Sequence, residues 1–127
     1  MKREIKFRGK RLDNSGWIYG MPTYDFRYIF NGEQLDSIDN YEVTPETVGQ
    51  FTGLKDKNGI DIYEGDIIRY YQPYSETFHT HIVRWDDLFA CFGLFKQDSK
   101  WCVESDWLKI QEVEVIGNIH DNPKLLK

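Results

Sequence analysis

Hydrophobic and polar positions alternate in several parts of this chain, which predicts β-strands with one buried face. The first such segment is Glu4–Arg8, in which every second residue is apolar. A second strand is expected at Trp17–Tyr19, where aromatic and β-branched residues are concentrated. Between them, Asp13–Gly16 consists of residue types that favour turns. The sequence therefore predicts an N-terminal β-hairpin.

Further short strands are expected along the rest of the chain. They are Tyr24–Phe30, Ile67–Tyr71, Phe78–Trp85, Leu88–Phe95, Trp101–Val103, Trp107–Ile110 and Glu112–Ile119. No segment keeps a helical period for two turns, and only Thr44–Glu46, with a proline suited to a helix start, predicts a short helical turn. Short strands with turns roughly every 8–12 residues are typical of a barrel or sandwich. The predicted fold class is mainly β, with little helix.

Two turns are expected close together in the middle of the chain. Asn58-Gly59 favours a tight type I′ hairpin turn, because both residues tolerate positive φ angles. A second turn is expected at Glu64–Asp66, where Gly65 supplies the same backbone freedom. Ile60–Tyr63, between these turns, is expected to form a short strand.

Composition narrows the class of protein. The chain has 127 residues, of which 40% are hydrophobic and 16% aromatic, and its formal net charge is −5. These values favour one folded domain and disfavour a generally basic nucleic-acid binder. No run approaches the roughly 18 apolar residues of a membrane span, and the N-terminus lacks the apolar core of a signal peptide. Because Cys91 and Cys102 are too few for a disulfide scaffold, we expect a cytoplasmic domain that contacts no membrane.

The basic residues gather at the N-terminus. Residues 1–12 hold six lysines or arginines and one acid, whereas residues 33–66 hold nine acids and two lysines. Complementary charges of this kind steer association, either within the chain or between subunits. A solvated basic arm is the simpler alternative.

A stripe of basic residues on the first strand suggests one function. Lys6, Arg8 and Lys10 alternate with other residues, so their side chains are expected to share a face. Trp17 and Tyr19 on the next strand are expected nearby, and basic side chains beside exposed aromatic rings are typical of single-stranded nucleic-acid binding. The alternative is that Trp17 and Tyr19 belong to the core. Nucleic acid is therefore a possible partner that the net charge does not favour.

Two histidines could bind a metal. His79 and His81 lie two residues apart on an expected strand and therefore share a face. Zinc would need further ligands, for which Cys91, Cys102, His120 or an acid are available, but no second close pair of ligands exists. A pair of exposed or interface histidines is the simpler interpretation.

Acidic residues crowd the turns. They are Asp56, Asp61, Glu64 and Asp66, with Asp86 and Asp87 further on. Clustered carboxylates can hold a divalent cation for hydrolysis, but aspartate also favours turns through local hydrogen bonds. The chain has no phosphate-binding loop, nucleophile elbow or dinucleotide fingerprint. We expect no catalytic residue, no metal and no cofactor, and a metal-dependent hydrolase is the least favoured alternative.

The segment Val48–Arg69, VGQFTGLKDKNGIDIYEGDIIR, resembles the signature of the YopX family of small phage and prophage proteins. Other segments agree in the expected order: Lys6–Lys10, Gly16–Gly20, Val115–Pro123 and Leu125-Leu126. His120 departs from the pattern, in which an aromatic residue is expected. The segments 24–42 and 72–110 carry no pattern of the family.

The resemblance implies a mainly β fold whose C-terminal half is similar to an SH3-like small barrel, and it implies no activity, cofactor or functional residue. We accordingly expect a single unit with an N-terminal β region at 1–47, a barrel region at 48–122 and a tail at 123–127. The signature residues are expected to be structural. They are Gly53, Asp56, Asn58, Gly59, Tyr63, Glu64, Gly65, Asp66, Gly117, Asn118 and Pro123.

These observations together predict a non-enzymatic phage or prophage accessory domain that acts by protein interaction or self-assembly in the cytoplasm of a bacterial host. Its many aromatic residues support this, because exposed aromatic patches mark interfaces. An unidentified protein partner, with a homo-oligomer as one form, is expected. Nucleic-acid binding through the basic strand is the alternative.

Overall fold

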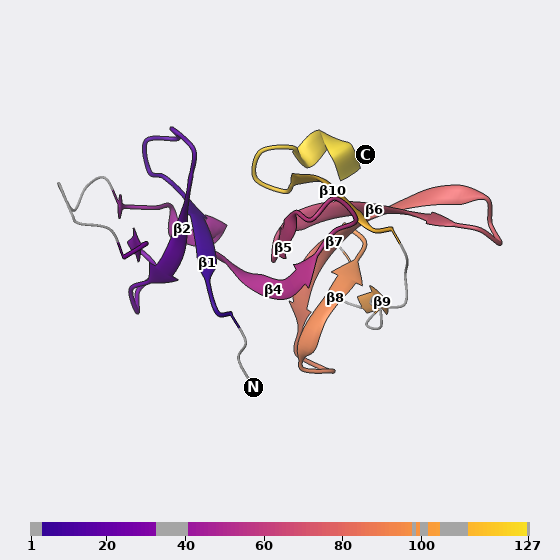
Figure 1. Cartoon of the computed structure of the whole chain (residues 1–127), viewed down its shortest axis with the longest axis horizontal. Helices are drawn as coiled ribbons and strands as arrows, with labels where there is room; N and C mark the ends of the chain where they lie inside the picture. The colour runs from indigo at the N-terminus through magenta and orange to yellow at the C-terminus, as the bar shows by residue number, and fades with distance from the viewer. Residues whose placement is uncertain (1–3, 33–40, 98, 100–101, 105–111, 127) are drawn as a thin grey trace. The chain divides into compact units, whose positions relative to one another are not determined.

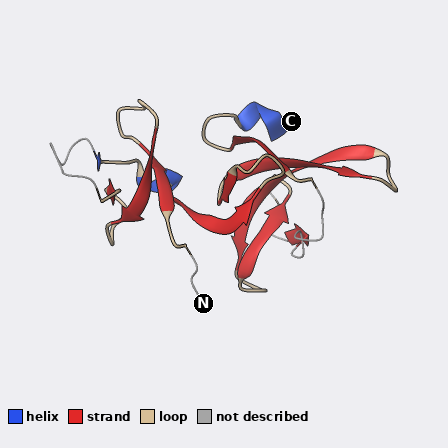
Figure 2. Cartoon of the chain, viewed as in Figure 1, coloured by secondary structure: helices blue, strands red, loops and turns tan. Residues whose placement is uncertain are grey.

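The computed structural model describes residues 4–32, 41–97, 99, 102–104 and 112–126. Strands dominate these residues, and the helical segments among them are single 3-10 turns with no α-helix (Figure 2). No helix within the described ranges is long and apolar enough to cross a membrane. The mainly β fold class is therefore confirmed. The chain divides into two compact units, Met1–Gly53 and Leu54–Lys127.

The first unit is built on antiparallel strands. They are β1 (Phe7–Lys10), β2 (Trp17–Pro22), β3 (Ile29–Phe30) and the start of β4 (Gly49–Lys55) (Figure 1). β1 pairs with β2 on one side, with Arg8 opposite Tyr19, and with Gly49 and Gln50 of β4 on the other. The hydrogen-bonded order is β3-β2-β1-β4-β5, where β5 is Asp61–Tyr63, and the chain passes from the first unit to the second within β4. The predicted N-terminal hairpin is confirmed.

The core of the first unit is small and tightly closed. It consists of Ile18, Ile29 and Val43. Isolated bridges join Val43 to Arg11 and Glu42 to Tyr28, so residues 42–43 pair with the residue that follows β1 on one side and with the residue that precedes β3 on the other. A Cβ atom on Gly9 would lie 2.8 Å from the Ile29 side chain and 3.1 Å from Val43. The predicted helical turn is also confirmed, as the 3-10 helix η2 (Pro45–Thr47).

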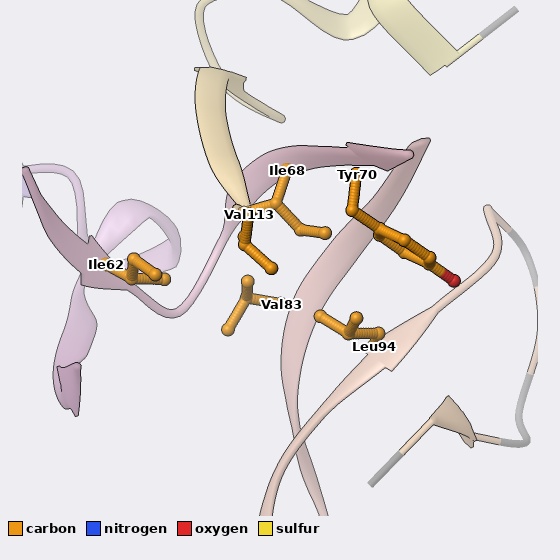
Figure 3. Close-up of a cluster of buried hydrophobic side chains, with 6 residues drawn as sticks. All are labelled: Ile62, Ile68, Tyr70, Val83, Leu94 and Val113. Atoms are coloured by element: carbon orange, nitrogen blue, oxygen red, sulfur yellow. The ribbon is translucent and has the colours of Figure 1, made fainter. Parts of the chain in front are cut away.

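The second unit holds a five-stranded antiparallel sheet. Its strands are β6 (Asp66–Gln72), β7 (Thr77–Asp86), β8 (Cys91–Phe95), β9 (Cys102–Glu104) and β10 (Glu114–Asn118), preceded by β5 (Asp61–Tyr63). Their order is β10-β6-β7-β8-β9. Ile68, Tyr70, Val83 and Leu94 on this sheet form a core cluster with Ile62 of β5 and Val113, which directly precedes β10 (Figure 3). Neither sheet closes on itself in the described part of the chain, so the implied small barrel is not confirmed.

The turn between β4 and β5 differs from the expected type. Gly59 has a φ of 80°, but Asn58 is not among the residues with positive φ, which a type I′ turn would require. Instead, the Gly59 amide donates to the Asp56 carbonyl and the Asp56 amide to the Ile60 carbonyl. This geometry is that of a three-residue loop in which only the glycine is left-handed. The hairpin is confirmed, and the prediction of its turn type is wrong.

Some predicted boundaries are wrong for a shared reason. Residues 24–27 and 87–90 form turns, so the strands expected at Tyr24–Phe30 and Leu88–Phe95 begin later. In both segments aromatic residues lie on a turn, where a scale of strand propensity cannot distinguish them from strand residues. Residues 123–126, expected as a tail, form the 3-10 helix η4 (Pro123–Leu126). The strand expected at Trp107–Ile110 lies outside the described residues.

Candidate functional site

The basic stripe of β1 is largely turned inward. Arg8 is only 7% exposed, and its guanidinium carbon lies 4.7 Å from the centre of the Trp17 ring. The Lys6 ammonium lies 4.7 Å from the centre of the Phe51 ring and 3.0 Å from a carboxylate oxygen of Glu4. Because Arg8 lies in the middle of the stripe, its burial leaves no continuous basic surface along this strand.

The remaining residues of the predicted nucleic-acid site are divided between interior and surface. Lys10 is half-buried, and its backbone amide donates to the Thr47 hydroxyl at 2.8 Å. Trp17 is half-buried beneath Arg8, whereas Tyr19 is exposed. The structure therefore brings Arg8 and Trp17 together as a cation–ring contact within the unit.

Asp56 acts as a connector between turn and sheet. Its Oδ1 accepts hydrogen bonds from the backbone amides of Asn58 and Ile60, and its Oδ2 accepts one from the Val115 amide at 3.0 Å. Burial favours the neutral form of this carboxyl, but the three amide donors outweigh it and hold the pKa of Asp56 below its usual value. The carboxylate thereby joins the β4–β5 turn to β10.

Two more of the clustered acids, Asp66 and Asp61, also have partners within the fold. Asp66 is buried, and its Oδ2 accepts a hydrogen bond from the Tyr63 amide at 2.8 Å. Asp61 forms an ion pair with Lys55. No group of three or more residues that could hold a metal ion occurs in the described ranges. Asp56 and Asp66 thus accept hydrogen bonds from backbone amides, and Asp61 pairs with a lysine.

The signature glycines occupy backbone positions that suit glycine for different reasons: Gly59 and Gly65 lie at turns, Gly53 lies within β4, and Gly117 lies at a close contact. Gly53, Gly59 and Gly65 have φ angles between 80° and 94°, which favour glycine. A Cβ atom on Gly117 would lie 2.6 Å from the side-chain oxygen of Asn122. The Asn118 side chain accepts hydrogen bonds from the amides of His120 and Asp121, just before Pro123 begins η4.

His79 and His81 share a face, as predicted, but their rings are stacked. The ring centres are 6.1 Å apart and the ring planes differ by 19°. Tyr70, on the neighbouring strand, lies 5.5 Å from the His79 ring and 5.7 Å from the His81 ring. The three rings therefore pack together as one aromatic stack. Cys91 and Cys102 are both half-buried free thiols.

Sequence reasoning missed a surface of aromatic residues on the hairpin of β6 and β7. Tyr71 and Phe78 face each other across the two strands, with ring centres 5.3 Å apart in an edge-to-face arrangement. The Arg69 guanidinium lies 5.1 Å from the Phe78 ring centre and 2.8 Å from a Glu114 carboxylate oxygen. Tyr71 is 45% exposed and Phe78 63% exposed. We call Arg69, Tyr71 and Phe78 the hairpin surface.

A weak signal of this surface exists in the sequence. Tyr70 and Tyr71 are adjacent on a strand, so one of them must point away from the core. Alternation alone does not reveal which one, because both are aromatic. In the structure Tyr70 is buried in the core cluster, and Tyr71 points to the other face.

A second apolar group lies at the β7–β8 turn. Leu88 and Phe89 are exposed there, close to Trp85, whose ring packs edge-on against Phe92 with centres 5.2 Å apart. The buried Asp86 supports the turn by accepting a hydrogen bond from the Leu88 amide at 3.0 Å. This group consists of a turn with flanking aromatic residues, whereas the hairpin surface is a paired sheet face.

Comparison with known proteins identifies a family and a similar crystal structure. A family model described as YopX protein matches residues 6–127. The crystal structure of protein EF1440 from Enterococcus faecalis is similar over 99% of this chain and 100% of its own, with 27% sequence identity and a TM-score of 0.61. No curated protein matches the chain.

Proposed function

We propose that this chain, which belongs to the YopX family, is a non-enzymatic protein-interaction domain that binds through the hairpin surface. The observation that carries the proposal is the pair of exposed rings, Tyr71 and Phe78, beside the half-exposed Arg69. Tyrosine and arginine are enriched among residues that dominate binding energy at interfaces.

The hairpin surface is held in place before any partner arrives. The two rings contact each other, Arg69 lies over one of them, and Glu114 fixes the guanidinium from β10. Side chains that are already ordered lose less conformational entropy on binding. Aromatic rings also bury a large area with few rotatable bonds. These properties support a docking role.

The charged groups that other functions would need are used inside the units. Arg8, in the middle of the basic stripe, is buried over Trp17. Asp56 and Asp66 accept backbone hydrogen bonds. This use supports a scaffold that presents a surface, in preference to a nucleic-acid groove or a hydrolytic centre.

The setting of the proposal follows the family resemblance. We propose that the chain is a phage or prophage protein that acts in the bacterial cytoplasm. We also propose that its second unit has an SH3-like arrangement and that self-association is one form of the interaction. The antiparallel order β10-β6-β7-β8 of short strands supports the SH3-like arrangement. The hairpin surface would serve a second copy of the chain as well as a different protein.

The test compares two variants that each remove two exposed apolar side chains from the second unit. In the first, Tyr71→Ser and Phe78→Ser remove the hairpin surface. In the matched control, Leu88→Ser and Phe89→Ser remove the β7–β8 turn group. Each tagged protein is used for affinity capture from nuclease-treated lysate of a lysogenic host, and each is analysed by sedimentation velocity. Thermal melts establish that both variants remain folded.

We expect the wild type and the control to retain the same partner or the same oligomer, and the hairpin variant to lose it. With purified partner, the loss of a central aromatic pair weakens binding by about 2 kcal/mol or more, about thirty-fold in Kd. Equal binding by the wild type and the hairpin variant contradicts the proposal, as does a complex lost only in the control. A complex that disappears with nuclease would favour nucleic acid instead.

A further inference from the structure

The face of the β6–β7 hairpin opposite the hairpin surface carries a stack of three rings. Tyr70 lies directly across from His79 and diagonally from His81, and all three ring-to-ring distances are between 5.5 and 6.1 Å. Figure 3 shows the Tyr70 ring at one end of the core cluster, close to Leu94. The stack therefore marks the point where the hairpin leaves the core.

Residues of the hairpin are buried on one side of this stack and exposed on the other. On the inner side, Ile67, Ile68, Ile82 and Val83 are fully buried. On the outer side, Tyr71, Phe78 and the turn at 73–76 are exposed. The outer pairs, Tyr70–His79 through Gln72–Thr77, form an arm that extends away from the core of its unit (Figure 1). Tyr70 at the base of the arm packs in the core cluster, but the pairs beyond it, Tyr71–Phe78 and Gln72–Thr77, have no core beneath them. Exposed strand pairs of this kind are among the least stable parts of a fold.

His81 is poorly placed to carry a charge. Its side chain is only 5% exposed, and among the described residues its Nδ1 is buried without a hydrogen-bond partner. Among the described residues, His79 on its own strand and Lys96 just beyond β8 act on its charge, and the Tyr70 ring on β6 packs against it. None of these is a carboxylate that would stabilise an imidazolium. Burial first, and then the charges of His79 and Lys96, lower the pKa of His81 below its usual value.

We propose that protonation of His81 opens the outer arm of the β6–β7 hairpin, residues 70–79, while the inner strands stay paired, so that the hairpin surface is assembled only when His81 is neutral. Opening lets the imidazolium reach water and separates it from His79. The same opening separates Tyr71 from Phe78, which face each other only while the strands are paired. The consequence for binding rests on the proposed function, but the opening is a property of the chain alone.

The direction of the pH dependence follows from the lowered pKa. In the open arm His81 titrates near its ordinary value of 6.5, and in the closed arm it titrates lower. Closure is therefore unaffected above pH 6.5 and weakens as the pH falls from 6.5 toward the lower value. One proton is taken up on opening, so the opening equilibrium rises by at most about ten-fold per pH unit in this window.

The experiment measures amide hydrogen exchange in the full chain between pH 7.5 and pH 5, with rates expressed as protection factors. In the wild type, protection of amides in 70–79 should fall by up to ten-fold per pH unit below pH 6.5, while amides in 82–86 and 91–95 keep their protection. In His81→Phe, which retains a ring in the stack, protection of the arm should not change with pH. His120→Gln is the matched control and should behave as the wild type.

Three results would overturn the proposal: protection of the arm that is independent of pH, simultaneous loss in the arm and the inner strands, or the same loss in His81→Phe. If His81→Phe does not fold, the His81 ring is titrated by NMR in the wild type, and its midpoint must lie below pH 6.5, at the lower end of the pH range over which the arm loses protection. Because no partner is present, failure here is distinct from failure of the proposed function. Partner binding that is lost in parallel with closure would connect the two.

Discussion

The hairpins β1–β2 and β6–β7 are built from similar residues and use them in opposite ways. In β1–β2 the Arg8 guanidinium is buried over the Trp17 ring, whereas in β6–β7 the Arg69 guanidinium is half exposed over Phe78. The cation–ring contact therefore belongs to the interior of one hairpin and to the surface of the other. An arginine beside an aromatic residue does not by itself mark a binding site, since its meaning depends on which face is covered.

Charge reversal at the two arginines gives the largest expected difference. Arg8→Glu buries a carboxylate against an aromatic ring and should lower the free energy of unfolding of the first unit by about 3–5 kcal/mol. Arg69→Glu places a carboxylate beside Glu114 at an exposed site and should lower that of the second unit by no more than about 1 kcal/mol. Urea titrations followed by amide signals of β2 and β8 measure each unit separately. Equal losses would mean that Arg8 is not buried as described.

The adjacent tyrosines of β6 sharpen the same contrast within one strand. Tyr70 is 9% exposed and belongs to the core cluster, while Tyr71 belongs to the hairpin surface. Tyr70→Ala should cost about 3–4 kcal/mol, because it leaves a cavity beside Val83 and Leu94. Tyr71→Ala should cost about 1 kcal/mol, chiefly from the lost contact with Phe78. Denaturant midpoints measure both losses of stability. A larger loss in Tyr71→Ala than in Tyr70→Ala would mean that Tyr71, and not Tyr70, faces the core.

Asp56 is the counterpart of Arg8 in the second unit, a charged group used inside the fold. Asp56→Ala removes hydrogen bonds to three backbone amides and should cost about 2 kcal/mol. The surface pair of Asp61 with Lys55 provides the control, since Asp61→Ala should cost less than about 1 kcal/mol. Thermal melts at neutral pH compare the two variants.

The pH dependence of Asp56 gives a separate test. Its pKa in the folded chain lies below the ordinary value of 3.8. The stabilisation that it provides is therefore complete above pH 3.8 and is lost as the pH falls through the lower folded value. Asp56→Ala should show a shallower loss of stability in this acidic window than the wild type. An unchanged slope would mean that the carboxylate does not accept these bonds.

The fold could be predicted from the sequence where local chemistry and burial agree. Three features were predicted in this way: the N-terminal hairpin, the turns at glycines and the buried strand β6. In each of them residues that favour strands lie next to residues that favour turns, so the hydrophobic pattern and the turn residues predicted the same structure. The predicted starts of the strands at Tyr24–Phe30 and Leu88–Phe95 were wrong because aromatic residues lie in the turns that precede the observed strands. Both segments look like strand by composition, and only the backbone distinguishes them.

The candidate site was much less predictable than the fold. Alternation along a strand predicts that Lys6, Arg8 and Lys10 share a face, but it does not reveal that Arg8 is buried. Which face meets the core is decided by contacts between segments far apart in the sequence, such as Glu114 of β10 with Arg69 of β6. The hairpin surface depends on such contacts, so no short motif could reveal it.

The turns of the two hairpins provide the finest comparison. Asn14, in the β1–β2 turn, has a φ of 61°, and Glu76, in the β6–β7 turn, has a φ of 53°. Asparagine tolerates this left-handed conformation, whereas glutamate is strained by about 1–2 kcal/mol. Glu76→Gly should relieve the strain and, after the added freedom of the unfolded chain is subtracted, stabilise the arm by about 0.5–1 kcal/mol. Asn14→Gly should change stability by less than about 0.3 kcal/mol. Amide exchange of the arm measures the effect of Glu76→Gly, and urea midpoints measure the effect of Asn14→Gly. A loss of stability in Glu76→Gly would mean that contacts of the Glu76 side chain outweigh its backbone strain.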